Sequence, residues 1–212
     1  MFVSIAGNIG SGKSSLTRLL ANHFNWIPFF ESVDDNPYLS DFYADMKRWS
    51  FHLQVYFLSN RFTNHKKIIE MPEPVVQDRS IYEDVEIFAR NLHEMGNMDA
   101  RDYRNYRELF NIMVGYLKPP DLMIYLRASV DTLLKQIRLR GRSYEQSISK
   151  DYLERLNVSY EDWTAGYNIG RLLTIESDEI DFVNNGDHLS DIIKKVANAL
   201  QLHESEAARR AR

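Results

Sequence analysis

A glycine-rich loop near the N-terminus most constrains what this chain can fold into. Residues 7–14 read Gly-Asn-Ile-Gly-Ser-Gly-Lys-Ser, which satisfies the pattern G-x-x-x-x-G-K-[ST] in full. The loop follows an apolar run, Phe2–Ala6, and opens a stretch of helical period, Ser14–His23. Because this strand–loop–helix context is the one in which the motif binds phosphate, the chain is predicted to begin as an α/β protein.

The residue types in this loop suit a phosphate group. Glycines at positions 7, 10 and 12 let the backbone curl so that its N–H groups point inward, and the following helix adds partial positive charge. Lys13 would bridge the β- and γ-phosphates of a nucleoside triphosphate, and the Ser14 hydroxyl would ligate Mg²⁺. The residues expected to bind the triphosphate are Gly7, Asn8, Ile9, Gly10, Ser11, Gly12, Lys13, Ser14 and Ser15.

The rest of the chain alternates between strand-like and helix-like patterns. Further apolar or β-branched runs predict strands at Trp26–Phe30, Val75–Gln77, Leu122–Leu126 and Leu172–Ile175. Stretches of helical period between and after them predict helices at Leu39–Lys47, Trp49–Glu70, Ser80–His93, Tyr103–Leu117, Val130–Arg140, Lys150–Trp163 and Leu189–Leu200. This alternation predicts a three-layer α/β fold with a mostly parallel sheet, in one domain of residues 1–202 with a mobile tail at 203–212.

The composition excludes several classes of protein. The 212 residues contain no cysteine, which rules out a disulfide scaffold, a zinc ribbon and a thiol enzyme. With 26 basic and 30 acidic residues the net charge is −4, so a protein that coats nucleic acid is not expected. No apolar run approaches the roughly 18 residues of a membrane span. The N-terminus enters an apolar strand without a basic segment, so we expect a cytoplasmic protein with no membrane partner.

The phosphate loop leaves the fate of the γ-phosphate open between a GTPase switch, an ATPase motor, a nucleotide kinase and a small-molecule kinase. The guanine-reading pattern Asn-Lys-x-Asp does not occur, which weakens the switch. The strand that would carry the paired acids of a motor ends instead in Asp78-Arg79-Ser80. An acid there suits Mg²⁺ and the adjacent arginine suits an acceptor oxygen or a phosphate, so the pattern favours a kinase. The alternative interpretation is a structural ion pair at a strand end.

Glu31 directly follows the second predicted strand and is the candidate general base. Since the carboxyl ends of parallel strands face the ligand crevice, this carboxylate should lie near the phosphates. It would accept the proton of an attacking hydroxyl and would repel an acceptor that already carries a phosphate. This favours a nucleoside acceptor over a nucleotide. The alternative is a surface acid that caps the next turn.

A second group of polar residues would face the acceptor. Gln54 and Arg61 are two helical turns apart in apolar surroundings, so they need polar partners that a planar base can supply. Asp84 would pair with Arg61 across that pocket, and an internal salt bridge without a ligand is the alternative. Tyr43 would offer its hydroxyl to a sugar. Gln54 alone decides little because its amide can flip.

The pattern Arg140-Gly141-Arg142, with Glu145 after it, ends a helix and starts a charged loop. Arginines on a lid commonly neutralise charge on a transferring phosphoryl group. A solvated basic face is the alternative. The histidines are scattered without metal-ligand spacing, so no metal held by protein ligands alone is predicted.

Taken together, the motifs resemble the deoxynucleoside kinase family, and specifically its bacterial deoxyadenosine/deoxycytidine kinase branch. The resemblance extends from Gly7 to about Ala199. It is carried by Gly7–Ser14, Asp35–Leu39, Trp49–Gln54, Asp78–Tyr82 and Arg140–Arg142. It implies a five-stranded parallel sheet flanked by helices, an arginine-containing lid and a homodimer.

The resemblance also implies a role for each candidate residue. Residues matching the catalytic ones are Glu31 as general base, Arg79 on the 5′-hydroxyl, Lys13, and the lid arginines Arg140 and Arg142. Residues matching those that bind the nucleoside are Tyr43 and Glu145 at the 3′-hydroxyl and Gln54, Arg61 and Asp84 at the base. Asp78 matches the acid linked to Mg²⁺, and Asp181 and Phe182 lie where the family contacts the ATP adenine.

The expected reaction is transfer of the γ-phosphoryl group of ATP to the 5′-hydroxyl of a deoxynucleoside, with Mg²⁺, in nucleoside salvage. Asp84, held ionised by Arg61, can only accept hydrogen bonds, so it should favour a base with an exocyclic amine. Deoxyadenosine is therefore expected first, with deoxycytidine and deoxyguanosine possible and thymidine poor. The competing interpretations are a nucleotide kinase of the thymidylate kinase type and a non-catalytic module that senses nucleotide.

Overall fold

A five-stranded parallel sheet organises the chain, in the order β2-β3-β1-β4-β5. The computed structural model describes residues 1–30, 36–142, 145 and 148–210, with side chains as far as Gln201. The strands are β1 Phe2–Gly7, β2 Ile27–Phe29, β3 Val75–Asp78, β4 Leu122–Arg127 and β5 Arg171–Glu176. This confirms the predicted sheet. Glu31, the predicted base, lies outside the described residues.

The first strand occupies the centre of the sheet. In register, Phe2 of β1 faces Val75 of β3 on one side, and Val3 faces Leu122 of β4 on the other. All residues of β1 are buried, as expected of a parallel strand that is covered on both faces. The glycine-rich loop therefore leaves the sheet from its most protected position.

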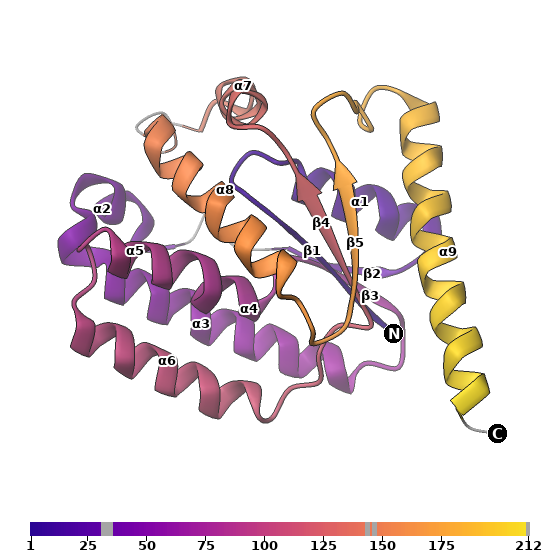
Figure 1. Cartoon of the computed structure of the whole chain (residues 1–212), viewed down its shortest axis with the longest axis horizontal. Helices are drawn as coiled ribbons and strands as arrows, with labels where there is room; N and C mark the ends of the chain where they lie inside the picture. The colour runs from indigo at the N-terminus through magenta and orange to yellow at the C-terminus, as the bar shows by residue number, and fades with distance from the viewer. Residues whose placement is uncertain (31–35, 143–144, 146–147, 211–212) are drawn as a thin grey trace.

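Helices cover both faces of the sheet (Figure 1). Helices α1 (Lys13–Phe24) and α9 (Gly186–Arg210) pack on one face. The remaining helices lie on the opposite side, where α7 and α8 pack on the sheet and α6 packs on other helices. Their bounds are α2 Leu39–Ala44, α3 Met46–Glu70, α4 Ile81–Glu83, α5 Arg90–Glu94, α6 Ala100–Val114, α7 Val130–Arg140 and α8 Lys150–Ala165. The result is the expected three-layer architecture.

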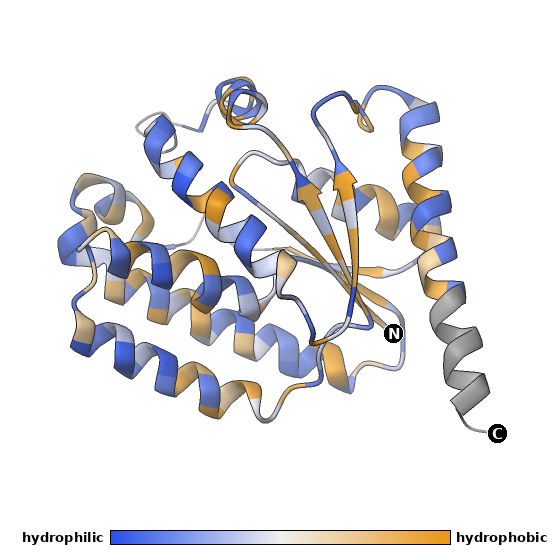
Figure 2. Cartoon of the chain, viewed as in Figure 1, coloured by the Kyte–Doolittle hydropathy of each residue, from blue (hydrophilic) through white to orange (hydrophobic). Residues whose placement is uncertain are grey.

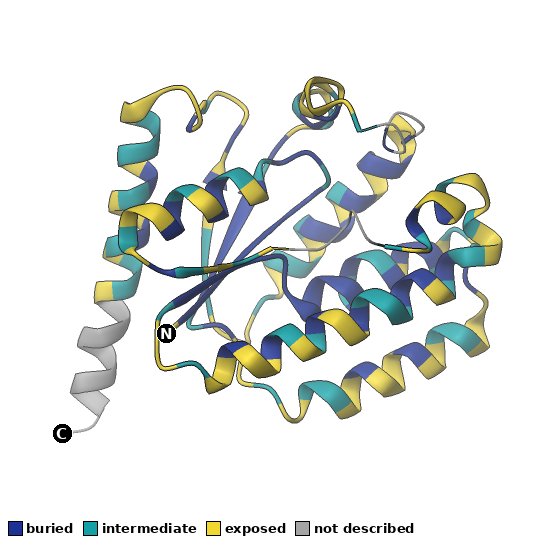
Figure 3. Cartoon of the chain, turned by 180° about the vertical axis from the view of Figure 1, so that it is seen from behind, coloured by how far each residue is buried: buried dark blue, intermediate teal, exposed yellow. Residues whose placement is uncertain are grey.

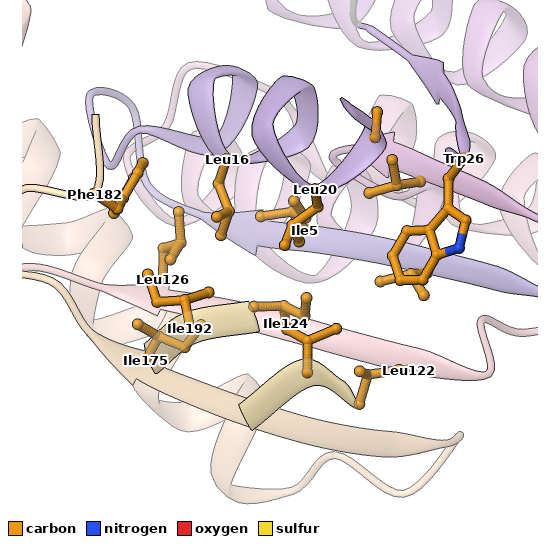
Figure 4. Close-up of a cluster of buried hydrophobic side chains, with 14 residues drawn as sticks. Ile5, Leu16, Leu20, Trp26, Leu122, Ile124, Leu126, Ile175, Phe182 and Ile192 are labelled. Atoms are coloured by element: carbon orange, nitrogen blue, oxygen red, sulfur yellow. The ribbon is translucent and has the colours of Figure 1, made fainter. Parts of the chain in front are cut away.

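Apolar side chains between these layers form the core. The strands are mostly hydrophobic, whereas hydrophobic and hydrophilic residues alternate along the helices (Figure 2). The inner strands β1, β3 and β4 are almost wholly buried, and the edge strands β2 and β5 are partly exposed (Figure 3). On the α1 side, Leu16 and Leu20 point toward Ile5 of the central strand, and Ile192 of α9 packs in the same cluster (Figure 4). The side of the sheet facing α8 packs Tyr125 against Tyr160 in a stacked pair. Within the described part of the chain, none of the helices combines the length and apolar character that a membrane span needs.

Several predicted helix boundaries are wrong. The continuous helix expected over Ser80–His93 is divided by a turn of π-helix at Asp84–Ala89, which separates α4 from α5. Such widened turns often occur at functional sites. The last helix begins at Gly186 and continues to Arg210, beyond the predicted end at Leu200.

Candidate active site

A cavity lies beside the carboxyl end of β3 and the phosphate loop, where the sheet predicts a ligand crevice. It is lined by residues from the loop, α2, α3, β3, the π-helix, α7 and α8. Most of the predicted site residues meet there: Ile9, Gly10, Lys13, Ser14, Tyr43, Gln54, Arg61, Asp78, Arg79, Asp84, Arg140, Arg142 and Glu145. The same cavity contains apolar side chains that the sequence had not singled out: Leu39, Phe42, Leu53, Phe57, Phe88 and Tyr152.

The phosphate loop is shaped by close packing against the core. A Cβ atom at Gly10 would lie 2.8 Å from the carbonyl oxygen of Leu133, and one at Gly12 would lie 2.9 Å from Phe182. Both glycines also have positive φ, at 87° and 91°. Only glycine fits such positions without strain or displacement of a neighbour. The curl of the loop is therefore fixed by the scaffold beneath it.

Asn8 belongs to this scaffold and points away from the cavity. Its side-chain amide donates to the carbonyl oxygen of Leu153 at 3.0 Å and to Asn157 Oδ1 at 2.7 Å, both on α8. Its own Oδ1 accepts from the backbone N–H of Ile9 at 2.7 Å. The predicted contact of Asn8 with the triphosphate would therefore use its backbone rather than its side chain.

The residues that are predicted to bind the metal and the phosphates, Lys13, Ser14 and Asp78, lie next to one another. The Lys13 ammonium group is buried and donates to the backbone oxygen of Asn8 at 2.8 Å, which keeps it over the loop. The Ser14 hydroxyl donates to Asp78 Oδ2. Asp78 Oδ1 is buried and has no hydrogen-bond partner among the described residues. A hydroxyl and a carboxylate with one unsatisfied oxygen suit Mg²⁺, so the residues present fit this ion.

Three buried polar residues form the far side of the cavity. Arg61 Nε lies 2.7 Å from Asp84 Oδ2, so these residues pair as expected from the sequence. Gln54 is also buried, and its Oε1 has no hydrogen-bond partner among the residues that the structure describes. The π-helix begins at Asp84 and also brings Phe88 to the cavity. The group combines an acceptor-only carboxylate with an unsatisfied amide oxygen and aromatic faces, which suits a planar base.

Arg79 follows β3 in a left-handed backbone conformation, with φ of 67°. Its guanidinium group donates to Tyr160 Oη at 3.0 Å and to the backbone oxygen of Gly7 at 3.4 Å, and it lies over the Phe88 ring at 4.4 Å. A non-glycine residue in this region is uncommon and frequently marks a functional site. The arginine lines the cavity, and its guanidinium group lies between the phosphate loop and the aromatic ring.

Glu83 is a buried carboxylate next to Arg79 that the sequence reasoning missed. Its Oε2 accepts from the Ser80 backbone N–H at 2.8 Å, and its Oε1 accepts from the Tyr160 hydroxyl at 2.8 Å. Burial raises the pKa of Tyr160 well above its ordinary value, so this hydroxyl stays protonated and acts as a hydrogen-bond donor to Glu83. The available signal was the pattern Ser80-x-x-Glu83, which is typical of a capping box at a helix start.

The lid arginines pair with the carboxylate that follows them. Arg140 Nη2 lies 2.5 Å from Glu145 Oε2, and Arg142 Nη1 lies 3.5 Å from Glu145 Oε1. Glu145 lines the cavity and is almost fully buried, whereas both arginine side chains are about one-third exposed, at 36% and 34%. Two arginines and one acid give this edge a net positive charge, which suits an anionic group.

The structure separates Asp181 and Phe182 from the cavity. Phe182 is buried in the core against Gly12 (Figure 4). Asp181 is exposed, and its Oδ1 accepts from the backbone N–H groups of Val183 and Asn184 at 3.2 and 2.9 Å. The Phe182 ring therefore packs against the phosphate loop at Gly12. The side chain of Asp181 stabilises the turn in which it lies.

Comparison with known proteins identifies the family. The family model for deoxynucleoside kinase matches residues 3–201. The chain belongs to the deoxynucleoside kinase family. It is thus a phosphotransferase, and the P-loop fold with its flanking helices matches the solved structures of deoxyadenosine kinases.

Relatives that are named for different bases have similar sequence identity to this deoxynucleoside kinase. It is 40% identical to a deoxyadenosine/deoxycytidine kinase of Bacillus subtilis, over 93% of this chain and 92% of that protein. It is 38% identical to a deoxyguanosine kinase of Lactobacillus acidophilus, over 94% and 90%. A deoxyadenosine kinase structure from M. mycoides with bound dATP aligns with a TM-score of 0.82 and 31% identity, over 93% and 99%.

Proposed function

We propose that this protein transfers the γ-phosphoryl group of ATP to the 5′-hydroxyl of a deoxynucleoside, with deoxyadenosine as the preferred acceptor, in nucleoside salvage. One observation carries the proposal: the buried pair Arg61–Asp84 shares a cavity with the phosphate loop and Arg79. A base held at the pair would extend its sugar toward Arg79, where a triphosphate in the loop presents its last phosphate. The relatives named for deoxyadenosine support the same acceptor.

In this proposal different residues neutralise charge on the phosphates, bind the 5′-hydroxyl and accept its proton. Lys13 neutralises charge on the β- and γ-phosphates, and Arg140 and Arg142 neutralise charge that develops on the transferring group. Arg79 binds the 5′-hydroxyl, and Glu31 accepts its proton. Mg²⁺, when bound beside Ser14 and Asp78, supplies further charge neutralisation of the phosphates.

The sugar would lie between these groups and the base pocket. Tyr43 lines the cavity and would donate to the 3′-hydroxyl, while Glu145 would accept from it. The ATP adenine would lie near the turn that contains Asp181 and Phe182, outside the cavity. Since Phe182 is buried, we assign this contact to the backbone and to exposed neighbours rather than to its ring.

The preference for deoxyadenosine follows from the donors and acceptors of the base pocket. Asp84 beside Arg61 presents acceptor oxygens only, so it pairs with the exocyclic amine of adenine or cytosine. Thymine presents a carbonyl oxygen and a methyl group and would leave the buried carboxylate unsatisfied. Mispairing in a buried polar site can discriminate by about 10⁴-fold.

The test is competition among deoxynucleosides and their monophosphates with ATP and Mg²⁺, scored by product. The wild type should use deoxyadenosine best and thymidine poorly. Arg61→Met combined with Asp84→Ala should shift relative kcat/KM toward thymidine. As a control, Arg90→Met with Glu94→Ala removes a half-exposed ion pair and should leave the preference unchanged. A wild type that prefers thymidine overturns the assignment of the base.

The assignment of the general base requires its own measurement. Glu31→Gln keeps the size of the side chain but cannot accept a proton, so turnover should fall by about 10²–10⁴-fold with a smaller change in nucleoside affinity. Efficient phosphorylation of monophosphates by this variant, with nucleosides ignored, would favour the nucleotide kinase interpretation instead.

We also propose a homodimer in the cytoplasm. Exposed apolar side chains at the end of α6 support the dimer: Leu109 and Ile112, one turn apart on the helix, and Tyr116 just beyond it are 40%, 63% and 73% exposed. Such a contiguous apolar face is typical of a protein interface. Sedimentation should give twice the mass of the chain, and Ile112→Asp should shift it toward the monomer. A monomeric wild type overturns this part.

A further inference from the structure

The Glu83 carboxylate is completely buried, at 0% exposure, and the reaction as proposed does not use it. A buried charge is costly unless it is paired and hydrogen-bonded, so its partners show what stabilises it. The two oxygens divide these partners. Oε2 accepts from the backbone N–H and the hydroxyl of Ser80, at 2.8 and 3.4 Å, which completes the cap of α4.

The other oxygen, Oε1, takes no part in the cap of α4. Glu83 Oε1 accepts from the Tyr160 hydroxyl at 2.8 Å and from the backbone N–H of Gly7 at 3.3 Å, and it lies 3.8 Å from Arg79 Nη1. These partners come from α8, from the start of the phosphate loop and from the end of β3. A capping glutamate requires none of them, so this oxygen connects three segments that the cap alone would leave separate.

Tyr160 connects the same carboxylate to the arginine. Its hydroxyl donates to Glu83 and accepts from Arg79 Nη1, while Arg79 Nη2 donates to the Gly7 oxygen at 3.4 Å. The closed set Gly7–Glu83–Tyr160–Arg79 thus ties the first glycine of the loop, through both its N–H and its C=O, to the guanidinium group. An arginine with a strained backbone is held in one orientation by these bonds.

We propose that Glu83 and Tyr160 are positioning residues that fix the Arg79 guanidinium group relative to the phosphate loop and so align the acceptor hydroxyl with the γ-phosphate. The inference rests on the proposed role of Arg79 at the 5′-hydroxyl. Its physical basis is that small misplacements of reacting groups are expensive: a displacement of about 1 Å can cost about 10²-fold in rate. Neither residue is among those that line the cavity, so both would act through Arg79 and Gly7.

The first measurement is Tyr160→Phe, which removes the hydroxyl and retains the ring that stacks on Tyr125. We expect kcat to fall by about 10–100-fold while KM for ATP and for the nucleoside change by less than about twofold. The matched control is Tyr125→Phe, which removes the other hydroxyl of the stacked pair, bonded to Glu161 at 2.9 Å. A similar loss of melting temperature in both variants, with a loss of kcat in Tyr160→Phe alone, supports positioning. An equal loss of kcat in both overturns it.

A double-mutant cycle tests whether the effect passes through Arg79. In an Arg79→Lys background the planar group is gone, so Tyr160→Phe should cause little further loss of kcat. The same loss in both backgrounds would contradict the inference. Glu83→Gln keeps the size of the side chain and should reproduce the selective loss of kcat if it folds. The comparison is run on whichever deoxynucleoside the wild type prefers, so a wrong base assignment leaves this test intact.

Discussion

The phosphate loop and the lid arginines would act on the same phosphates, yet their geometry is fixed in different ways. The loop is held by the core, with Gly10 and Gly12 pressed against neighbouring atoms and Asn8 bonded to α8. Arg140 and Arg142 are held mainly by charge, through their pairing with Glu145. The difference indicates that the loop has its binding shape before any ligand arrives, whereas the lid arginines depend on one carboxylate for theirs.

The largest effect should come from the loop. Lys13→Ala removes a charge that acts chiefly in the transition state, so kcat should fall by about 10³-fold or more while the melting temperature changes little. Steady-state kinetics and thermal unfolding would measure both. Lys135→Ala, at an exposed position on α7, is the control and should behave as the wild type. Near-normal turnover of Lys13→Ala would exclude a catalytic phosphate loop.

A smaller effect is expected at the lid. Glu145→Gln removes the charge that holds Arg140 and Arg142 in place, so kcat should fall by about 10-fold or more. Stability should change little because both arginines are partly exposed. Glu161→Gln is the matched control, because it breaks an Arg–Glu pair of the same length, 2.5 Å to Arg127, and should leave kcat unchanged. If Glu145→Gln destabilised the fold as strongly as it slowed the reaction, the contrast between the two regions would fail.

Two glycines, one in the phosphate loop and one beside the lid arginines, allow the two regions to be compared by the free energy of unfolding. Gly12 and Gly141 both have positive φ, at 91° and 71°, but a Cβ atom meets Phe182 at Gly12 and nothing within 4 Å at Gly141. Gly141→Ala should therefore cost only backbone strain, about 1–2 kcal/mol. Gly12→Ala should cost more, since a ring must also move. Denaturant unfolding of the two variants measures the difference, and equal losses would show that the core does not shape the loop.

The smallest effect concerns pH and the strand beneath the loop. His65 of α3 is buried against Phe2, where β1 begins, and its Nε2 contacts the Lys118 backbone oxygen at 2.8 Å. Burial lowers the pKa of His65 below its ordinary 6.5, the hydrogen bond to Lys118 opposing in part. The unfolded chain therefore binds the proton first, and the free energy of unfolding should fall as pH drops below about 6.5.

This pH dependence can be measured by denaturant unfolding between pH 7.5 and about 5. His65→Gln should flatten the curve, although it can lower the stability at neutral pH. Asn22→Gln, at an exposed position on α1, is a suitable control because it introduces the same side chain without removing a titratable group, and it should leave the slope unchanged. Identical slopes in the wild type and His65→Gln would contradict the assignment.

Most of the fold and much of the site could be predicted from the sequence. Strands buried on both faces leave continuous apolar runs, and the phosphate loop fixes the first of them against a helix. The pairing of Arg61 with Asp84 was also predictable, because two polar residues in apolar helices need partners. Each of these features could be predicted because it depends on a pattern of residues within a short stretch of sequence.

The features that were missed depend on packing between distant segments. Glu83 reads as a capping residue, and only the fold brings Gly7 and Tyr160 to its second oxygen. The π-helix at Asp84–Ala89 has no distinct periodicity in a short window, so the sequence predicted a plain helix. The family resemblance places Phe182 near adenine, and only the fold shows that its ring packs against Gly12.

The central place of β1 has a consequence for how the chain is made. This strand is translated before both of its neighbours, β3 at Val75–Asp78 and β4 at Leu122–Arg127. Every pairing in the sheet is parallel and needs a crossover, so the contacts that secure β1 are far apart in the sequence and slow to form. We expect the nascent chain to carry its phosphate loop without this support until β4 has been translated. The loop is then synthesised before the strands that secure it and becomes rigid only after they have paired.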